Sequence, residues 1–208
     1  MPAYASDKAE DAVVRVNRST GGHCTGFIIA PKTVVTAAHC LWIQRTRHWI
    51  QPRSLHVLVG YDRGKYRQHL RVTAYRVAKT FRPRLKPGKD AGVGDWALLT
   101  LHAPYDGRPL PLAKRRPPNG LKLSLAGFAS TKRHRLTRHA VCRVTKVGKV
   151  RFLHSCPAVT GLSGAPLFAW SNGARVAFGV HAASSKSRGL AVLSTMIRRD
   201  AAYTPYSQ

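Results

Sequence analysis

Apolar residues along the chain fall in short runs of four to eight positions, separated by glycine, proline and polar residues. Residues 121–127 alternate between apolar and polar positions, residues 66–77 do so in part, and residues 24–30 are mostly apolar. Runs of this length are typical of β-strands, whereas a helix of a globular protein needs a longer segment with a 3.6-residue period. The pattern therefore predicts an all-β protein.

The expected strands begin at residue 13 and end near residue 193. They cover residues 13–16, 24–30, 33–37, 55–60, 66–77, 95–101, 121–127, 165–170, 176–183 and 189–193. Residues 1–10 are small, polar and charged, and we expect a loose arm there. Proline and glycine predict an irregular loop over residues 83–94, and residues 194–208 leave room for one short helix.

A proline-dense basic stretch divides the chain. Residues 103–120 contain five prolines and three consecutive basic residues. Proline cannot donate a hydrogen bond within a sheet, so this stretch is the best candidate for a link between two units. A chain of 208 residues is long enough for one large domain or for two small barrels with separate cores. We predict domains at residues 1–112 and 113–208.

Candidate chemistry centres on Ser163, which lies in the segment Gly161-Leu162-Ser163-Gly164. Glycines near a serine let the backbone turn tightly and let a substrate approach, although such segments also occur in ordinary turns. A serine hydroxyl becomes a good nucleophile only when a base removes its proton and a third group orients that base. His39, at the end of a β-branched run, and Asp95, before an apolar run, supply these groups.

The three segments, in the order His, Asp, Ser, resemble the signatures of the chymotrypsin-like serine proteases over residues 13–197. The resemblance implies two six-stranded Greek-key β-barrels with the active site in the cleft between them. It also implies that His39 is the general base, Asp95 its orienting carboxylate and Ser163 the nucleophile. The backbone N–H groups of Gly161 and Ser163 would form the oxyanion hole. We expect a serine endopeptidase that acts on polypeptides without a cofactor or a metal.

Leu162 departs from the digestive members of this family. Those enzymes carry an aspartate directly before the serine, which pairs with a newly cut N-terminus, and a leucine cannot make this ion pair. The bacterial glutamyl-endopeptidase-like branch also lacks the aspartate, and it resembles this chain best. Activation by cleavage at the N-terminus is therefore not expected.

The specificity pocket is expected to contain Pro157, Ala158, Thr160 and His181. Pro157 stands where trypsin-like relatives carry the carboxylate that receives Lys or Arg, and residues 107–199 contain no Asp or Glu. His181 resembles the histidine that contacts the substrate carboxylate in glutamyl endopeptidases, and Thr160 would donate a second hydrogen bond. We predict cleavage after Glu, with an apolar pocket for Leu, Met or Phe as the alternative and trypsin-like cleavage third.

The four cysteines fall as two near pairs, Cys24 with Cys40 and Cys142 with Cys156. A first bridge would join two strands beside His39, and a second would brace the segment before Ser163. The alternatives are reduced thiols or a metal site, but no C-x-x-C or H-E-x-x-H spacing supports a metal. Two disulfides predict a secreted or periplasmic protein. The N-terminus lacks a signal-peptide pattern, so we expect a leader that has been removed.

Charge raises a further alternative. Thirty-five Lys and Arg against eight Asp and Glu give a formal net charge of +27, which concentrates anions at the surface. Non-specific binding to nucleic acid, anionic lipid or polysaccharide is therefore expected. The alternative function is a catalytically weak or inactive protease-fold protein that binds polyanions through its cationic surface. No apolar run approaches the ~20 residues that span a bilayer. We expect a monomer.

Overall fold

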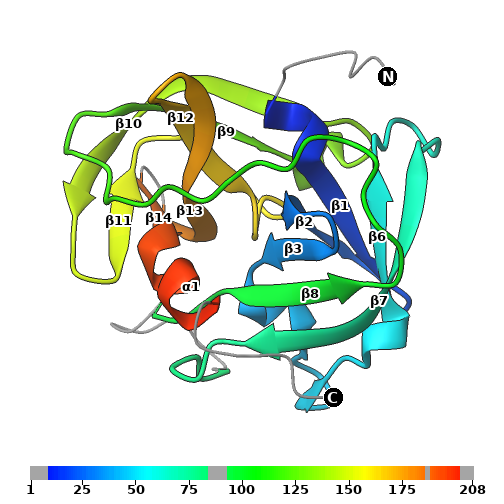
Figure 1. The fold of residues 1–208 in the computed structure, drawn as a ribbon. Coiled ribbons are helices and arrows are strands. Elements are labelled where there is room, and N and C mark those ends of the chain that lie inside the picture. The colour runs from blue at the N-terminus through cyan, green and yellow to red at the C-terminus, as the bar shows by residue number, and fades with distance from the viewer. Residues whose placement is uncertain (1–8, 84–92, 186–187, 202–208) are drawn as a thin grey trace.

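The computed structural model describes residues 9–83, 93–185 and 188–201, which form two β-barrels side by side (Figure 1). The first barrel is a closed antiparallel sheet in the order β1-β2-β3-β8-β7-β6. Its strands are β1 (Val13–Arg18), β2 (His23–Ala30), β3 (Thr33–Thr36), β6 (Leu55–Val59), β7 (Gln68–Val77) and β8 (Ala97–Leu101). The fourth strand in chain order, β6, pairs with β1, which gives a Greek-key connection.

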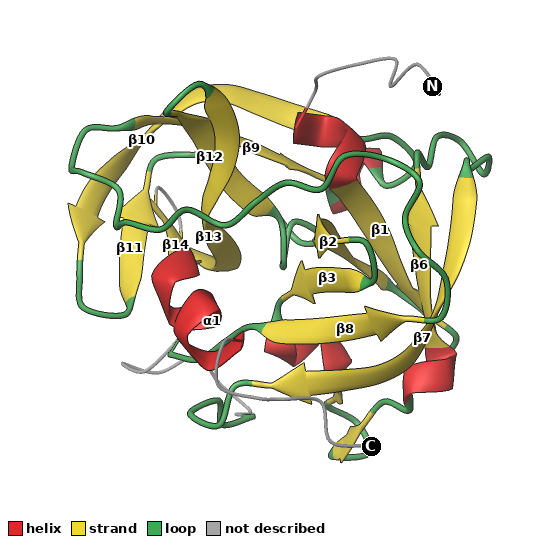
Figure 2. Cartoon of the chain, in the orientation of Figure 1, coloured by secondary structure: helices red, strands yellow, loops and turns green. Residues whose placement is uncertain are grey.

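The second barrel is also a closed antiparallel sheet of six strands, in the order β10-β11-β14-β13-β12-β9. Its strands are β9 (Lys122–Gly127), β10 (Thr137–Val147), β11 (Arg151–His154), β12 (Pro166–Ser171), β13 (Ala174–Ser185) and β14 (Arg188–Leu193). Figure 2 shows that strands dominate both barrels. The prediction of an all-β protein with two six-stranded barrels is therefore confirmed.

The remaining elements are short. They are the 3₁₀ helices η1 (Ala9–Ala12), η2 (Ala38–Leu41), η3 (Pro52–Ser54) and η4 (Ser130–Lys132), the strand pair β4 (Trp42–Ile43) and β5 (His48–Trp49), and the helix α1 (Ser194–Ala201). The helix α1 agrees with the helix expected near the C-terminus. Among the described residues, no helix has the length and apolar character needed to cross a membrane.

Alternating side chains fill each barrel. In β8, Ala97, Leu99 and Leu101 are buried, while the residues between them are partly exposed. This is the two-residue period expected of a strand with one face in a core. Large buried side chains such as Phe27 and Phe152 occupy the interiors of the first and second barrel. The rigid barrels hold the loops between their strands in fixed positions.

The stretch between the barrels first follows the first barrel, where the Leu110 N–H donates to the Ile28 carbonyl at 2.8 Å, and then crosses to the second. Leu112 forms a bridge with Ala177 of β13, and the Ala177 N–H donates to the Pro111 carbonyl at 2.8 Å. No named strand lies between β8 and β9, as the proline content requires. The division of the chain at residue 112 stays a prediction.

Two parts of the chain differ from expectation. Glu10 was expected in a loose arm but belongs to η1, and its carboxylate pairs with Arg138 at 2.9 Å and with Arg175 at 3.4 Å. These arginines lie on β10 and β13 of the second barrel, so the ion pairs fasten η1 to that barrel.

The strands β10 and β11 were not expected at all. Residues 1–8, 84–92 and 202–208, where an arm, a loop and a chain end were expected, lie outside the described residues.

Candidate active site

The pairing of β3 with β8 brings His39 and Asp95 together. Thr36, the last residue of β3, lies opposite Ala97, the first residue of β8, so the segments beyond these residues meet at one edge of the barrel. The His39 Nδ1 atom lies 2.7 Å from Asp95 Oδ2, and the His39 backbone N–H donates to Asp95 Oδ1 at 2.9 Å. Both carboxylate oxygens therefore fix the position of this histidine.

The electrostatic surroundings of His39 favour its protonated form. Partial burial lowers the pKa of the imidazole, but the charge and the hydrogen bond of Asp95 together outweigh burial, and Arg18 opposes them only weakly. The net result is a pKa above the ordinary value of 6.5. Because Asp95 accepts from Nδ1, the neutral ring carries its proton on Nδ1, which leaves Nε2 free to accept a proton.

Ser163 lies in the segment 155–165 between β11 and β12, which we call the nucleophile loop. Its backbone carbonyl accepts a hydrogen bond from the Thr25 N–H at 2.9 Å, and the sulfur of Cys40 lies 4.0 Å from the same carbonyl. The loop therefore lies between the two barrels (Figure 1), beside β2 and η2. The element η2 contains His39. This arrangement brings Ser163 to the edge of the first barrel where His39 and Asp95 meet.

Thr25 is a positioning residue that the sequence analysis missed. Its buried hydroxyl donates to the Gly161 carbonyl at 2.8 Å and accepts from the Phe128 N–H at 2.9 Å. One side chain of the first barrel thus holds two segments of the second barrel. A single threonine after Cys24 carries no sequence signal for this role, because its partners lie more than 100 residues away.

The N–H groups of Gly161 and Ser163, which flank Leu162 in the nucleophile loop, are the expected oxyanion-hole donors. Leu162 donates to the Val159 carbonyl and Gly164 donates to the His181 carbonyl. In the described part of the chain, neither the Gly161 N–H nor the Ser163 N–H has a hydrogen-bond acceptor among the protein atoms. Gly161 has a φ of +91°, which a residue with a side chain rarely adopts. Alternate N–H groups with this freedom are suited to bind a negatively charged oxygen.

Gly164 lets the nucleophile loop approach the first barrel closely. A Cβ atom at this position would overlap the Thr25 carbonyl oxygen and the Thr36 hydroxyl, and the φ of Gly164 is +86°. We expect Gly164→Ala to lower the free energy of unfolding by about 3 kcal/mol or more, because overpacking and left-handed backbone strain add. Chemical denaturation measures this loss.

Gly173→Ala is the matched control for this prediction. Gly173 also has a positive φ, of +74°, but a Cβ atom there would meet nothing within 4 Å. Its substitution carries only the backbone cost of about 1–2 kcal/mol. Equal losses of stability in the two variants would show that the close approach at Gly164 has no energetic importance.

His181 flanks the nucleophile loop from β13. Its N–H donates to the Ala165 carbonyl at 2.9 Å, and its ring is nearly buried beside that of His154, with His154 Nε2 at 3.2 Å from His181 Nδ1. The Cys156 N–H donates to His154 Nδ1 at 3.2 Å, so the proton of a neutral His154 lies on Nε2. That N–H donates to His181 Nδ1. The proton of a neutral His181 therefore lies on Nε2.

Both histidines are neutral at physiological pH. Burial lowers the pKa of His154 to about 4. For His181, burial is again the largest influence on the pKa. The nearby imidazoles of His154 and His39 act in the same direction, Asp95 opposes them, and the pKa falls to about 3. Because His39 and Asp95 both affect the pKa of His181, these two residues lie close enough to interact with it electrostatically. His154 is a second residue that the sequence analysis did not identify.

The other residues predicted for the specificity pocket have fewer contacts. Pro157 and Thr160 are exposed, and Ala158 packs against the core of the second barrel. The Thr160 carbonyl accepts from the Ser130 N–H at 2.8 Å, but within the described residues no hydrogen bond joins Thr160 to His181. Leu162 is fully buried in the apolar core of the second barrel. Leu162 thus makes apolar contacts at the position where the digestive enzymes have an aspartate paired with the N-terminus.

The cysteines form the two expected disulfides, Cys24–Cys40 and Cys142–Cys156. The first joins β2 to η2 beside His39, and the second joins β10 to the nucleophile loop. A ring nitrogen of His39 and the sulfurs of Cys24 and Cys40 lie within 4.8 Å of one another, a spacing that would suit a metal ion if the thiols were free. These sulfurs are bonded to each other, so neither offers a thiolate as a metal ligand.

Two comparisons with known proteins agree with this geometry. The family model described as "Trypsin-like peptidase domain" matches residues 24–178. Coagulation factor XII of Cavia porcellus is 36% identical over 88 residues. The aligned region covers 40% of this chain and 13% of that protein.

Proposed function

Because the chain belongs to the trypsin-like peptidase family, we propose that it is a serine endopeptidase with His39, Asp95 and Ser163 as its catalytic residues. The observation that carries the proposal is the contact of 2.7 Å between His39 Nδ1 and Asp95 Oδ2, at the edge of the barrel that holds the nucleophile loop. A base oriented by a buried carboxylate and placed near a partly exposed serine is the arrangement that activates a hydroxyl.

The proposed reaction proceeds through an acyl-enzyme. Ser163 Oγ attacks the carbonyl carbon of the scissile bond, and its proton passes to His39 Nε2. The carbonyl oxygen becomes an oxyanion, which the free N–H groups of Gly161 and Ser163 stabilise. Collapse of this intermediate breaks the C–N bond, and His39 gives the proton to the leaving amine. A water molecule then attacks the ester with the same base, which restores Ser163.

For the substrate residue before the scissile bond, we propose glutamate, as in the glutamyl-endopeptidase-like branch. The support is the neutral pair His154 and His181, whose hydrogen bonds leave the His181 Nε2–H as a fixed donor. Because His181 is neutral, it needs no bound anion to balance its charge. A substrate carboxylate can therefore accept this hydrogen bond directly. No acidic residue of the second barrel competes for the donor, since residues 107–199 contain no Asp or Glu.

We predict that peptides with Glu before the scissile bond are cleaved fastest. A hydrogen bond to a charged group contributes about 1.5–3 kcal/mol, which corresponds to roughly 10–100-fold in kcat/KM over a matched Gln, Leu or Phe peptide. Peptides with Arg or Lys should be slowest, because their charge would be buried without a partner. Digestion of a mixed peptide library, with cleavage sites identified by mass spectrometry, measures activity and preference together.

His181→Leu supplies the control. We expect the variant to lose the advantage of Glu peptides while it still cleaves Leu peptides, which separates specificity from catalysis. If Arg or Lys peptides are cleaved faster than Glu, Leu and Phe peptides, the pocket assignment is wrong.

The position of Glu10 supports this specificity. Glu10 is the only glutamate in the chain, and an enzyme that cleaves after Glu would therefore have a single self-cleavage site of this kind. The Glu10 side chain is only 12% exposed and pairs with two arginines. Its ion pairs keep the peptide bond that follows Glu10 within the 3₁₀ helix η1. A protease active site needs its substrate in an extended conformation, which this helical segment does not have.

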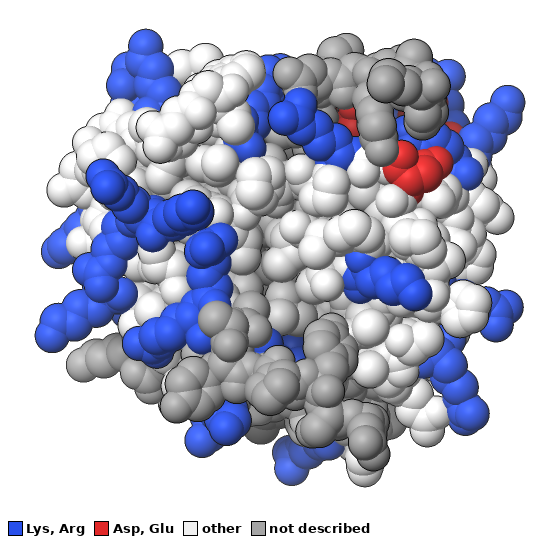
Figure 3. All heavy atoms as spheres, viewed as in Figure 1, with Lys and Arg blue, Asp and Glu red and all other residues white. Residues whose placement is uncertain are grey.

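The two disulfides are consistent with an extracellular protein, and we propose that the protein is exported. The alternative function is binding of polyanions by an inactive protease fold. Lys and Arg side chains spread over both barrels in Figure 3, and few acidic side chains accompany them. This charge favours binding to heparin or duplex DNA at low salt, with an affinity that falls steeply as salt rises. Reactivity of Ser163 distinguishes the two functions.

A further inference from the structure

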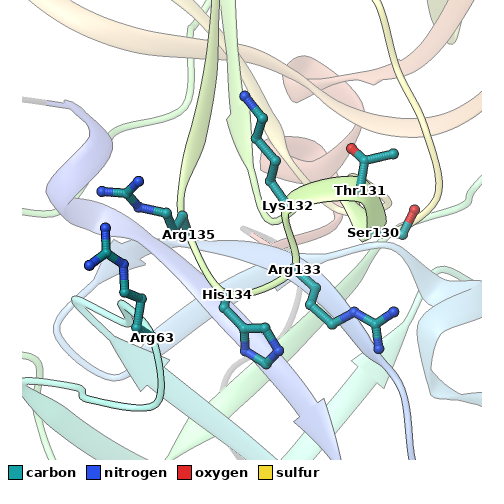
Figure 4. Close-up of a pocket in the computed structure, with 7 residues that line it drawn as sticks. All are labelled: Arg63, Ser130, Thr131, Lys132, Arg133, His134 and Arg135. Carbon is teal, nitrogen blue, oxygen red and sulfur yellow. The ribbon is translucent and has the colours of Figure 1, made fainter.

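A cationic hollow lies beside the nucleophile loop. It has a volume of about 340 Å³ and is lined by Arg63 and residues 130–135 (Figure 4). Four of these residues carry a permanent positive charge, and none is acidic. We call this feature the loop pocket. Its residues play no part in the proposed chemistry.

The backbone of the loop pocket is fixed by both barrels. The Ser130 N–H donates to the Thr160 carbonyl at 2.8 Å, which joins the pocket to the nucleophile loop three residues before Ser163. The Arg63 N–H donates to the His134 carbonyl at 2.7 Å, and the Arg15 side chain donates to the Arg133 carbonyl. These bonds involve the main chain of the lining residues. Their cationic side chains therefore stay available.

The charge of the loop pocket is only partly neutralised. The Asp62 carboxylate lies 3.6 Å from Arg135 Nε, in a pair with both side chains more than half exposed. A solvent-exposed pair of this kind is weak. The Tyr61 hydroxyl lies 2.9 Å from His134 Nδ1 and adds no charge. In the ion pairs of the described residues, Lys132 and Arg133 have no acidic partner.

The directions of the side chains indicate an extended ligand. In Figure 4, Lys132 and Arg133 leave the loop on opposite sides, while Arg63 and Arg135 lie near each other on a third side. A single small anion cannot contact all of them, but a chain with several negative groups can. Apart from His134, no ring lines the pocket on which a nucleic acid base could stack.

The neighbourhood of the nucleophile loop favours a polypeptide over other polyanions. A peptide cleaved at Ser163 continues past the nucleophile loop on both sides of the scissile bond. An extended chain advances about 3.3–3.6 Å per residue, so side chains three to five residues from that bond lie roughly 10–18 Å away. Acidic side chains at such positions can reach cations on a loop bonded to Thr160.

We propose that the loop pocket is an accessory substrate-binding site that recognises acidic residues flanking the scissile bond, an inference that rests on the proposed protease function. Exposed ion pairs are individually weak, but two or three together lower KM by about tenfold. They act before the chemical step, so kcat should not change. The site would direct the protease to acidic segments of polypeptides.

The test compares matched peptides with the same residues around the scissile bond and either neutral or Asp-rich flanks, on each side in turn. At low salt, we expect KM to be about tenfold lower for one of the acidic peptides than for its neutral partner, with equal kcat. Lys132→Ala/Arg133→Ala should abolish this difference and leave cleavage of the neutral peptide unchanged. High salt should have the same effect.

Lys146→Ala/Lys149→Ala is the control variant. It removes the same charge from the exposed far end of β10 and the turn after it, roughly 30 Å along that strand from the loop pocket. We expect it to keep the preference for acidic flanks. If both double variants lose the preference equally, net charge is responsible and the proposal is overturned.

Direct binding separates this proposal from the protease function. Fluorescence anisotropy measures binding of the labelled acidic peptide to Ser163→Ala protein, with and without each pair of substitutions. A loss of about tenfold in affinity with the Lys132/Arg133 pair alone supports the loop pocket even if no peptide is cleaved. If the affinity for heparin depends on Lys132 and Arg133 and the affinity for the acidic peptide does not, the pocket binds sulfated polysaccharide and the proposal is wrong.

Discussion

Replacing Ser163 with alanine should lower kcat by about 10⁶, to the limit of detection, while the protein stays folded. The proposed mechanism has no second group that could form the acyl-enzyme, so the remaining residues cannot substitute for the hydroxyl. Loss of the base in His39→Ala should reduce kcat by a similar factor, because the two groups act as a unit. Hydrolysis of the best library peptide measures both effects.

Ser171→Ala is a suitable control for the serine substitution. Ser171 ends β12, the strand that follows the nucleophile loop, and its hydroxyl has no role in the proposed mechanism. This variant should retain full activity. Near-normal activity in folded Ser163→Ala protein, with circular dichroism like that of the wild type, would exclude Ser163 as the nucleophile.

The second large effect is expected for Asp95→Asn, with a fall in kcat of about 10⁴. Asp95 accepts from both the His39 ring and the His39 backbone, and an asparagine side chain has only one oxygen for these two donors. If its NH₂ group faces Nδ1, the imidazole proton moves to Nε2 and the ring can no longer accept the serine proton. Steady-state kinetics with the same peptide measures the loss.

The pH profile gives this prediction a second readout. Only neutral His39 acts as a base, so activity is present above the pKa of His39 and is lost as the pH falls through it. Asp95 raises that pKa above 6.5, whereas burial and Arg18 lower it. The acid limb of kcat/KM should therefore lie above pH 6.5 in the wild type and at lower pH in Asp95→Asn. An unchanged acid limb in the variant would contradict the role of Asp95.

Much of the fold could be predicted from the sequence because most strands have regular patterns. The strands β2, β3 and β9 lie within one or two residues of the predicted ranges. Pro31 follows the apolar run of β2, and Gly127 ends that of β9. The sequence also contains the three segments that the structure gathers at one edge. Their order along the chain, rather than any single motif, carried the family resemblance.

The strand β10 could not be predicted, for a physical reason. Its register shifts between Ala140 and Cys142, and Val141 has a φ of +67°, so a bulge breaks the two-residue alternation in the middle of the strand. Val141 is 70% exposed, which places an apolar residue outward where the pattern requires a polar one. Arginine and lysine on the outer face make the apolar pattern of this strand harder to recognise. A constant two-residue alternation of apolar and polar residues is therefore absent from this strand.

The parts of the candidate site that were missed depend on distant contacts. Thr25 bonds to residues 103 and 136 positions away, and His154 pairs with His181 from another strand. Neither residue belongs to a local motif, and only the barrel closure brings each to its partner. The charge on Glu10 gave no indication of its position either, because its two arginine partners lie in the second barrel.

Covalent labelling with a serine-directed fluorophosphonate tests the central claim most directly. An activated hydroxyl displaces the leaving group and keeps the phosphonyl group, so we expect one adduct per wild-type protein, on the peptide that contains Ser163. His39→Ala should remain unlabelled over the same time, because its serine lacks a base. A folded wild-type protein without an adduct, or with labelling at Ser163 that His39→Ala retains at the same rate, would contradict the claim that this site is a working serine protease.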